Sequence, residues 1–266
     1  MSRTIVVTGA ASGIGRATQS LLESAGDTVI GVDLAGSEID ADLSSADGRA
    51  SLAAGVHERL EGRPLDAVIA VAGVALPSAL TVHVNYFGAA ATLRDLRPLL
   101  DKSDAPRAAL VSSFSTVQDV DHPLVDAMRA DDESLAAARA EQITADGRGH
   151  LVYASTKRAI SEWVRRTAIT DAWARAGIPL NAVAPGIILT PMTAPLMETD
   201  EGRAQLTATV PMPLHGPADP IVIARALAWL TAPENTHITG QVLFVDGGAE
   251  ASLRGPAIFD TPTPSY

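Results

Sequence analysis

The sequence predicts an α/β fold, a doubly wound sheet of seven mostly parallel strands with helices on both faces. Short β-branched apolar runs alternate along the chain with longer helix-like segments, the order of elements that builds a parallel sheet. The apolar runs are nearly continuous, as expected of strands that helices cover on both sides. The length of 266 residues fits one domain over 1–266, because two halves would each have a thin core.

The predicted elements follow one another in a regular order. Strands are expected at 4–8, 28–32, 67–70, 108–112, 180–184 and 241–245, with a weaker strand around Ile39. Helices are expected near 14–25, 46–61, 79–100, 153–176 and 218–231. Aromatic residues make up only 4% of the chain, so the core must be packed from Ala, Val, Leu and Ile.

Three segments interrupt this order. Residues 115–150 are an acidic, Ala-rich insertion, predicted to be helical because the acidic stretch 131–134 precedes an Ala-rich run. Residues 187–217 contain five prolines and little periodicity, which predicts a mobile substrate loop or lid. From Gly255 onward, Pro256, Pro262 and Pro264 predict a terminal arm.

Charge and composition exclude several classes of function. The formal net charge of −11 leaves no basic stripe, so neither nucleic acid nor an anionic membrane is an expected partner. The absence of cysteine excludes disulfides and thiolate chemistry, and the six histidines lack ligand spacing, so no metal site is expected. No uncharged apolar run reaches the ~18 residues of a membrane span. Because the first residues also lack a signal-peptide pattern, a soluble cytoplasmic protein is expected.

A glycine-rich turn follows the first predicted strand and leads into a helix. It reads Thr8-Gly9-Ala10-Ala11-Ser12-Gly13-Ile14-Gly15. Backbone N–H groups and the positive end of a helix dipole would face an anion at this turn, and glycines let the backbone approach closely. The order of strand, turn and helix favours a pyrophosphate site over an ordinary tight turn. The predicted contact residues are Gly9, Ser12, Gly13, Ile14 and Gly15.

The spacing Thr-Gly-x-x-x-Gly-x-Gly resembles that of the short-chain dehydrogenase/reductase family, in its single-domain branch. Other dinucleotide folds use the tighter Gly-x-Gly-x-x-Gly spacing. The resemblance implies a Rossmann fold, a nicotinamide dinucleotide cofactor and a homodimer or homotetramer. It continues to Asp246-Gly247-Gly248 after the last predicted strand, so it spans nearly the whole chain.

Asp33, directly after the second predicted strand, indicates which dinucleotide is bound. A carboxylate there can accept hydrogen bonds from the hydroxyls of an adenine ribose and repels a 2′-phosphate. Family members that use NADP usually carry Arg or Lys at the position of Ser12 or Leu34. Since this chain has neither cation there, NAD is the predicted cofactor.

Three further motifs resemble parts of the family's cofactor site. Asp42-Leu43 matches the pair that touches adenine, and Ala72-Gly73 matches the end of an Asn-Ala-Gly motif. The Asn of that motif is replaced by Val71, which leaves the local hydrogen bonding to be explained. Pro185-Gly186 matches the turn under the nicotinamide, and the resemblance implies that Ile188 and Thr190 hold the carboxamide.

Tyr153 and Lys157 have the spacing of an acid–base pair. In a helix that Tyr153 is predicted to open, the i, i+4 spacing puts both side chains on one face, about 5–6 Å apart at Cβ. An ammonium beside a phenol favours the phenolate, so Lys157 is predicted to lower the pKa of Tyr153. Tyr-x-x-x-Lys often occurs by chance, but behind a nucleotide turn the catalytic interpretation is the stronger one. The resemblance adds that both residues contact the cofactor, Lys157 through the nicotinamide ribose.

Ser113 and Asn85 complete the predicted catalytic set. Ser112 and Ser113 end the fifth predicted strand, at the edge where open α/β sheets bind ligands. The resemblance implies that Ser113 donates to the substrate oxygen, with Ser112 as the alternative one residue away. Asn85 matches the family's asparagine that orders a water behind the lysine. The alternative is an Asn that is satisfied within its helix.

These features predict an NAD(H)-dependent oxidoreductase that interconverts a secondary alcohol and a ketone. The insertion, with Val84-Asn85-Tyr86-Phe87-Gly88, resembles the bacterial 3α-hydroxysteroid dehydrogenase/carbonyl reductases. Few cations are available to the site, so a hydrophobic carbonyl substrate is expected, steroid-like, alicyclic or aryl. Met192, Leu196 and Met197 of the predicted loop suit such a ketone.

Two questions stay open at this point. A catalytically silent NAD(H)-sensing protein on the same fold is the alternative function, although such proteins typically lack the tyrosine or the lysine. The insertion either covers the active site, alters a subunit contact, or is a solvated acidic decoration.

Overall fold

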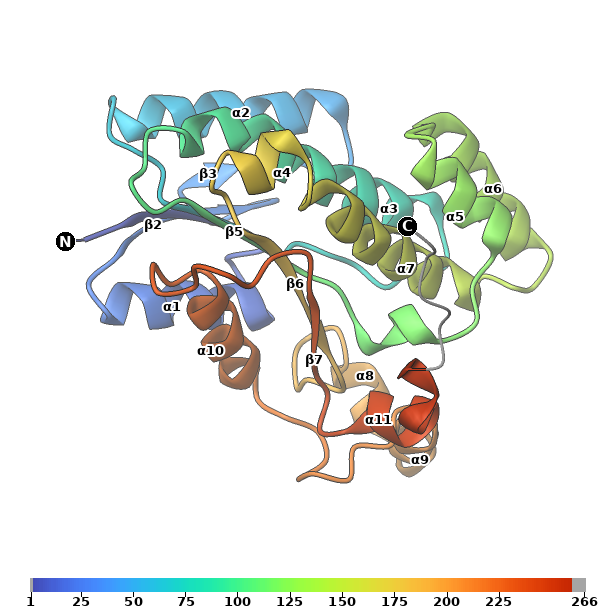
Figure 1. The fold of residues 1–266 in the computed structure, drawn as a ribbon. Coiled ribbons are helices and arrows are strands. Elements are labelled where there is room, and N and C mark those ends of the chain that lie inside the picture. The colour runs from blue at the N-terminus through green and yellow to red at the C-terminus, as the bar shows by residue number, and fades with distance from the viewer. Residues whose placement is uncertain (1, 260–266) are drawn as a thin grey trace.

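A sheet of seven strands runs through the part of the chain that this computed structural model describes, residues 2–259 (Figure 1). The strand order is β3-β2-β1-β4-β5-β6-β7, and every neighbouring pair is parallel. The predicted fold class is confirmed, and the sheet is parallel throughout. The strands are β1 (Thr4–Thr8), β2 (Thr28–Asp33), β3 (Ile39–Asp40), β4 (Ala67–Ala70), β5 (Arg107–Val111), β6 (Leu180–Pro185) and β7 (Val242–Val245).

Helices cover both faces of the sheet. On one face lie α1 (Gly13–Ser24) and α10 (Pro220–Leu230), and on the other lie α2 (Ala46–Leu60), α4 (Ala89–Leu100) and α7 (His150–Thr167) (Figure 1). Side chains alternate along each strand, so Ile5 and Val7 join the core on the α1 and α10 side, whereas Val6 joins the other. The strand order reverses between β1 and β4, which opens a crevice at the carboxyl ends of the strands.

The expected helix over 79–100 is divided by a wider turn. It consists of α3 (Ala79–Val82), a π-helical turn (η1, His83–Gly88) and α4. The interruption surrounds Asn85, whose side chain is bonded outside its own helix, to Val74. Such π-turns often occur at functional sites, and apolar periodicity alone does not reveal them.

The expected helix over 153–176 begins and ends earlier than predicted. It starts at His150, so Tyr153 lies one turn inside α7 instead of opening it, and it stops at Thr167. Thr170 has an extended backbone, and a separate π-helical turn (η3, Asp171–Arg175) follows it. The prediction of one continuous helix was therefore wrong at both ends.

The 115–150 segment contains a 3-10 turn (η2, Phe114–Val117), α5 (His122–Arg129) and α6 (Glu133–Ala145). Asp132 caps α6 by accepting a hydrogen bond from the backbone N–H of Leu135 at 2.9 Å. Both helices bury apolar side chains completely, including Leu124, Met128 and Ile143. The insertion is therefore packed into the main core and is not a solvated decoration.

The 187–217 segment is irregular only in part. It contains α8 (Ala194–Met197) and α9 (Asp200–Thr209). The Thr199 side chain caps α9 by accepting from the N–H of Gly202 at 3.0 Å, and two acidic residues follow in its first turn. This capping pattern could have been found in the sequence. At the C-terminal end, α11 (Ala249–Arg254) and a 3-10 turn (η4, Gly255–Phe259) are formed. Pro262 and Pro264 lie outside the described residues.

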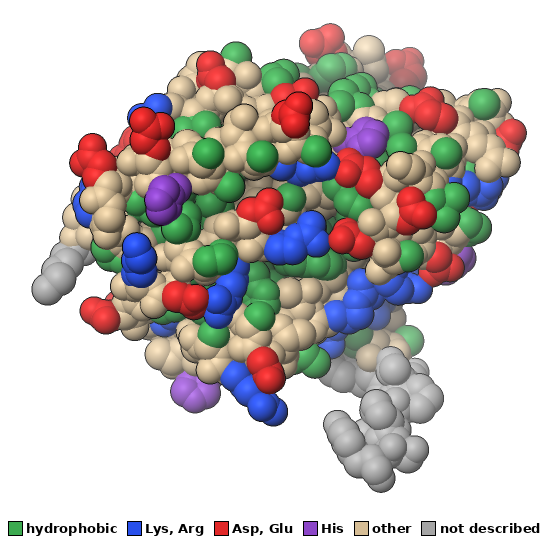
Figure 2. Space-filling model, turned by 90° about the horizontal axis from the view of Figure 1, so that it is seen from above, with side chains coloured by type: hydrophobic (Ala, Val, Ile, Leu, Met, Phe, Trp, Pro, Cys, Tyr) green, Lys and Arg blue, Asp and Glu red, His purple; other side chains and the backbone are tan. Residues whose placement is uncertain are grey.

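The surface mixes charges of both signs. Figure 2 shows acidic and basic side chains interspersed over the face that carries α2 and α4. Within residues 2–259, no helix combines the length and the apolar character that crossing a membrane requires.

Candidate active site

One cleft of about 680 Å³ lies at the carboxyl ends of the strands, beside the point where the strand order reverses. Its lining comes from segments that follow β1, β2, β3, β4, β5 and β6. All but one of the predicted site residues line it: Gly9, Ser12, Gly13, Ile14, Gly15, Asp33, Asp42, Leu43, Ala72, Gly73, Ser113, Tyr153, Lys157, Pro185, Ile188 and Thr190. Asn85 is the exception.

The glycine turn has the geometry of an anion site. Gly9 and Gly13 have φ of 70° and 49°, values that side chains with a Cβ rarely adopt. A Cβ on Gly15 would lie 2.0 Å from the carbonyl oxygen of Gly9, so the helix can approach the strand only with glycine there. Ser12 precedes α1 and makes no capping hydrogen bond through its side chain, which leaves the first N–H groups of α1 available to a phosphate. These residues fit a dinucleotide.

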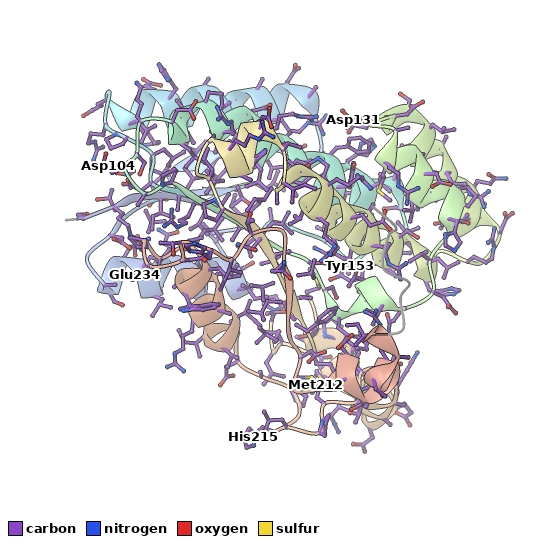
Figure 3. All side chains as sticks on the ribbon, viewed as in Figure 1. Asp104, Asp131, Tyr153, Met212, His215 and Glu234 are labelled. Carbon is purple, nitrogen blue, oxygen red and sulfur yellow. The ribbon has the colours of Figure 1, made fainter. Side chains whose placement is uncertain are left out.

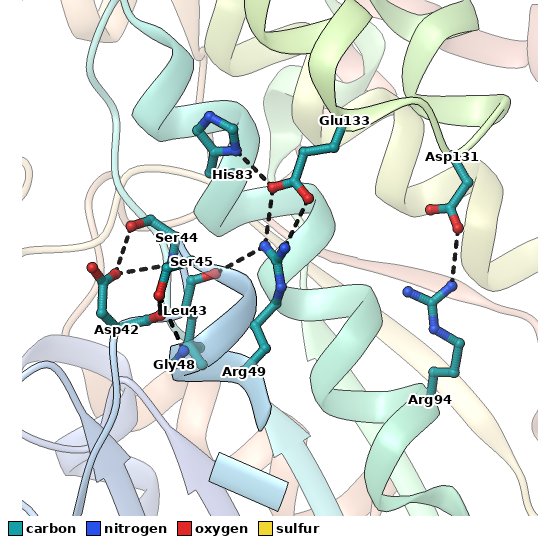
Figure 4. A network of polar contacts seen from close by, with 10 residues as sticks. All are labelled: Asp42, Leu43, Ser44, Ser45, Gly48, Arg49, His83, Arg94, Asp131 and Glu133. Atoms are coloured by element: carbon teal, nitrogen blue, oxygen red, sulfur yellow. Dashed lines mark hydrogen bonds and ion pairs between the residues drawn. The ribbon is translucent and has the colours of Figure 1, made fainter. Parts of the chain in front are cut away.

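Two carboxylates, those of Asp33 and Asp42, lie where the adenosine of a dinucleotide is expected to bind, and hydrogen bonds fix their positions. Asp33 accepts hydrogen bonds from the N–H groups of Ala11 at 2.9 Å and Leu34 at 2.7 Å. Its carboxylate is thereby fixed beside the glycine turn. Asp42 accepts from the hydroxyl of Ser44 at 2.6 Å and from its N–H at 2.9 Å (Figure 4). These hydrogen bonds keep the pKa of Asp42 below its usual value.

The departure at Val71 has a structural explanation. The hydroxyl oxygen of Thr8, at the end of β1, accepts from the N–H groups of Val71 at 3.0 Å and Ala72 at 3.1 Å. Backbone groups after β4 are therefore satisfied without an Asn side chain. Gly9 lies so close that a Cβ there would be 2.9 Å from the nitrogen of Ala72.

Tyr153 and Lys157 are brought together on α7, as the spacing predicts. The Nζ of Lys157 lies 5.7 Å from the centre of the Tyr153 ring and donates to the carbonyl oxygen of Val111 at 2.9 Å. Figure 3 shows Tyr153 between α7 and the segment that follows β5.

The predicted effect of Lys157 on Tyr153 is not what the structure shows. Burial raises the pKa of Tyr153, and a hydrogen bond with Ser113 only partly opposes this. Burial also lowers the pKa of Lys157 to about 8, below that of the phenol. Burial thus opposes the charged form of both side chains, so proximity to Lys157 alone does not lower the pKa of Tyr153 in this structure. Near neutral pH the pair consists of a phenol and an ammonium, the forms that ketone reduction needs.

Ser112 and Ser113 have different environments. Ser112 is buried, and its hydroxyl lies 2.6 Å from that of Ser161 in the core. Both serines line the cleft, but the oxygen of Ser113 accepts from the N–H of Ser115 at 3.1 Å and from its hydroxyl at 2.7 Å. With both lone pairs occupied, the hydroxyl proton of Ser113 is free to donate towards Tyr153 or a substrate oxygen. The geometry favours Ser113, and sequence reasoning missed Ser115.

Asn85 is buried behind the cleft. Its amide nitrogen donates to the carbonyl oxygen of Val74 at 2.8 Å, and its oxygen accepts from the N–H of Val74 at the same distance. The nitrogen also contacts the hydroxyl of Thr156 at 3.3 Å. These bonds fix the chain after β4 and lie outside the helix of Asn85, so the alternative of an Asn satisfied within its own helix is wrong. The water-ordering role stays a prediction.

Apolar side chains line the outer part of the cleft. Leu76 and Leu80 come from the chain after β4 and Met192 from the chain after β6, with exposed fractions of 48%, 40% and 44%. Of the three loop residues expected to face substrate, Met192 lines the cleft, whereas Leu196 and Met197, which belong to α8, do not. Leu76 and Leu80 were missed, since one leucine before a helix and one in its first turn give no functional signal.

Within residues 2–259, His, Asp and Glu side chains nowhere gather in threes that could hold a metal ion.

Comparison with known proteins agrees with the fold and the cleft. A family model described as enoyl-(acyl carrier protein) reductase matches residues 9–250. A 3-alpha-hydroxysteroid dehydrogenase/carbonyl reductase of Comamonas testosteroni is 34% identical over 94% of this chain and 97% of its own. A 3-oxoacyl-[acyl-carrier-protein] reductase of Thermotoga maritima is 29% identical over 91% and 96%.

A solved structure agrees with these relatives. The 3-alpha-hydroxysteroid dehydrogenase from Pseudomonas sp. B-0831, complexed with NADH, superposes with a TM-score of 0.87. It is 39% identical and covers 95% of this chain and 99% of its own. The chain is an oxidoreductase by fold and by site. It belongs to the short-chain dehydrogenase/reductase family.

Proposed function

We propose that this NAD(H)-dependent dehydrogenase/reductase interconverts hydrophobic ketones and secondary alcohols. The observation that carries the proposal is the position of Tyr153, Lys157 and Ser113 in one cleft with the glycine turn, Asp33 and an apolar outer wall. The relatives named for hydroxysteroids support a polycyclic or similarly apolar carbonyl substrate. The homo-oligomer and the cytoplasmic location stay predictions from the sequence.

The proposed roles follow from the geometry. NADH, when bound, supplies the hydride that reaches the carbonyl carbon. Ser113 donates a hydrogen bond to the carbonyl oxygen, and Tyr153 transfers its hydroxyl proton to that oxygen as negative charge develops. The Lys157 ammonium lies behind the Tyr153 ring and adds positive potential next to the developing charge. Alcohol oxidation follows the same route in reverse.

Kinetics with a ketone panel test the substrate class. The panel contains cyclohexanone, an aryl ketone, a four-ring 3-ketosteroid and a CoA-linked ketone, each with NADH. We expect the apolar ketones to have the higher kcat/KM, and a preference for the CoA-linked ketone would overturn the proposal. NADH binding without turnover of any ketone would instead support the sensing alternative.

Cofactor choice is predicted to depend on Asp33. Asp33→Ala should shift the ratio of kcat/KM for NADH and NADPH towards NADPH by roughly 100-fold, the scale expected when a charge about 4 Å from a 2′-phosphate is removed. Asp40→Ala is the matched control, because Asp40 is an exposed carboxylate at the end of β3 that does not line the cleft. An unchanged ratio in Asp33→Ala would contradict the assigned role.

Ser115 is predicted to make Ser113 a better donor. Ser115→Ala frees one lone pair of the Ser113 oxygen, so its proton can turn away, and kcat should fall by up to about tenfold with little change in NADH affinity. Ser161→Ala is the matched control, because it removes the same kind of partner from Ser112. A loss of kcat in the control, with none in Ser115→Ala, would assign the role to Ser112 instead.

A further inference from the structure

One wall of the cleft has little regular secondary structure. We call residues 74–80 the wall segment: residues 74–78 form neither helix nor strand, and Ala79 and Leu80 begin α3. Its side chains Leu76 and Leu80 line the cleft. The Asn85 side chain holds Val74, the first residue of the wall segment. The buried Thr81 hydroxyl accepts from the N–H of Leu76 at 3.0 Å and donates to its carbonyl oxygen at 2.7 Å. These anchors hold the start and middle of the wall segment, and its end needs others.

The remaining anchors come from the insertion. The Glu141 side chain of α6 accepts from the N–H of Ala79 at 2.7 Å. The Thr144 hydroxyl shares its proton between the carbonyl oxygen of Pro77 at 2.9 Å and that of Ala140, one turn earlier in α6, at 2.8 Å. Gly149, just before α7, packs so tightly that a Cβ there would lie 2.7 Å from the Cβ of Pro77. Residues more than sixty positions away therefore hold the end of the wall segment.

Helix α6 is itself fixed firmly enough to act as a support. Its side chains Ala136, Ala140 and Ile143 are completely buried. At its first turn, Glu133 pairs with Arg49 of α2 at 2.7 Å and with His83 of the π-helical turn at 2.6 Å (Figure 4). The helix is thus held through its apolar face and its first turn, independently of the wall segment.

We propose that Glu141 and Thr144 of the insertion are positioning residues that set substrate selectivity by holding Leu76 and Leu80 in place. The proposal rests on the proposed function, because it assigns a role to one wall of the same cleft. A segment with few backbone partners of its own opens easily once its side-chain anchors are removed. A large rigid ketone that spans the wall loses contact area and must reorder the wall on binding, whereas a small ketone near Tyr153 does not.

The double variant Glu141→Ala/Thr144→Val tests this. We expect the ratio of kcat/KM for a four-ring 3-ketosteroid to that for cyclohexanone to fall about tenfold, mainly through KM, on the scale of losing two exposed hydrogen bonds. Glu141→Gln keeps an acceptor oxygen for Ala79 and should restore most of the ratio in the Thr144→Val background. Gln142→Ala is the matched control, because Gln142 is exposed on the same helix and bonds only Arg139.

Hydrogen–deuterium exchange provides a readout that needs no turnover. The amide of Ala79 should exchange faster in the double variant than in the wild-type protein or Gln142→Ala, while exchange in β4 stays unchanged. Faster exchange with an unchanged selectivity ratio would overturn the selectivity proposal and leave the proposed function intact. If the wild-type protein reduces neither ketone, the proposed function fails instead. Unchanged exchange at Ala79 in the double variant would, separately, show that Glu141 and Thr144 do not hold the wall segment.

Discussion

Tyr153→Phe is expected to lower kcat for ketone reduction by about 1000-fold, within the range usual for loss of a general acid. The substitution keeps the ring on the cleft wall and removes only the hydroxyl that meets Ser113. The affinity for NADH, measured by its fluorescence on titration with protein, should change by no more than about twofold, since a single partly solvated hydroxyl contributes little to binding.

The two measurements together separate chemistry from binding. Loss of NADH affinity in parallel with kcat would indicate a damaged cleft, and Tyr86→Phe provides the matched comparison. Tyr86 is a buried tyrosine of the π-helical turn that does not line the cleft. It should retain wild-type kcat. A Tyr153→Phe protein with normal turnover would show that the proton comes from another group.

Lys157→Met is expected to abolish most activity and yet to stabilise the fold. Burial lowers the pKa of Lys157 from 10.5 to about 8, so keeping it charged in the folded state costs about 3 kcal/mol. Methionine fills similar space without charge, but it leaves the Val111 carbonyl without its donor, which costs about 1 kcal/mol. The net gain of about 2 kcal/mol should raise Tm by roughly 4–8 °C at pH 7.

The stabilisation should depend on pH in a definite direction. Below pH 8 the lysine is charged in both the folded and the unfolded chain, and the folded state bears the full cost of burying it. Between pH 8 and 10.5 only the unfolded chain holds the proton, so wild-type stability gains on the variant as the pH rises. Thermal unfolding of both proteins at pH 7 and pH 9.5 tests this. An advantage of Lys157→Met that grows with pH would contradict the burial of a charged amine.

The fold was predictable because its signal is local. Strands such as β1 and β4 are short apolar runs bounded by turns, and the glycine turn fixes the direction of the chain after β1. The predicted cofactor residues follow the carboxyl ends of strands, and parallel strands bring those ends to one edge. Ser113 follows β5, and Tyr153 lies on α7, between β5 and β6 in the chain. Because β5 and β6 are neighbours in the sheet, both residues reach the same cleft.

The remaining features depend on contacts that spacing does not encode. The i, i+4 spacing predicts that Lys157 lies near Tyr153, but the pKa of each depends on how far the folded chain removes water from it. The anchors Glu141 and Thr144 meet the wall segment only through tertiary packing. The π-helical turn keeps the same apolar pattern as an α-helix, so the prediction of one helix over 79–100 could not detect it.

The fate of a labelled hydride tests the central claim most directly. NADH carrying deuterium at C4, in the transferable position, is incubated with an apolar ketone and the wild-type protein, and the alcohol is analysed by mass spectrometry. The account predicts one deuterium on the carbinol carbon with the wild-type protein and no detectable labelled alcohol over the same time with Tyr153→Phe. Alcohol formed without deuterium, or labelled equally fast by both proteins, would contradict it.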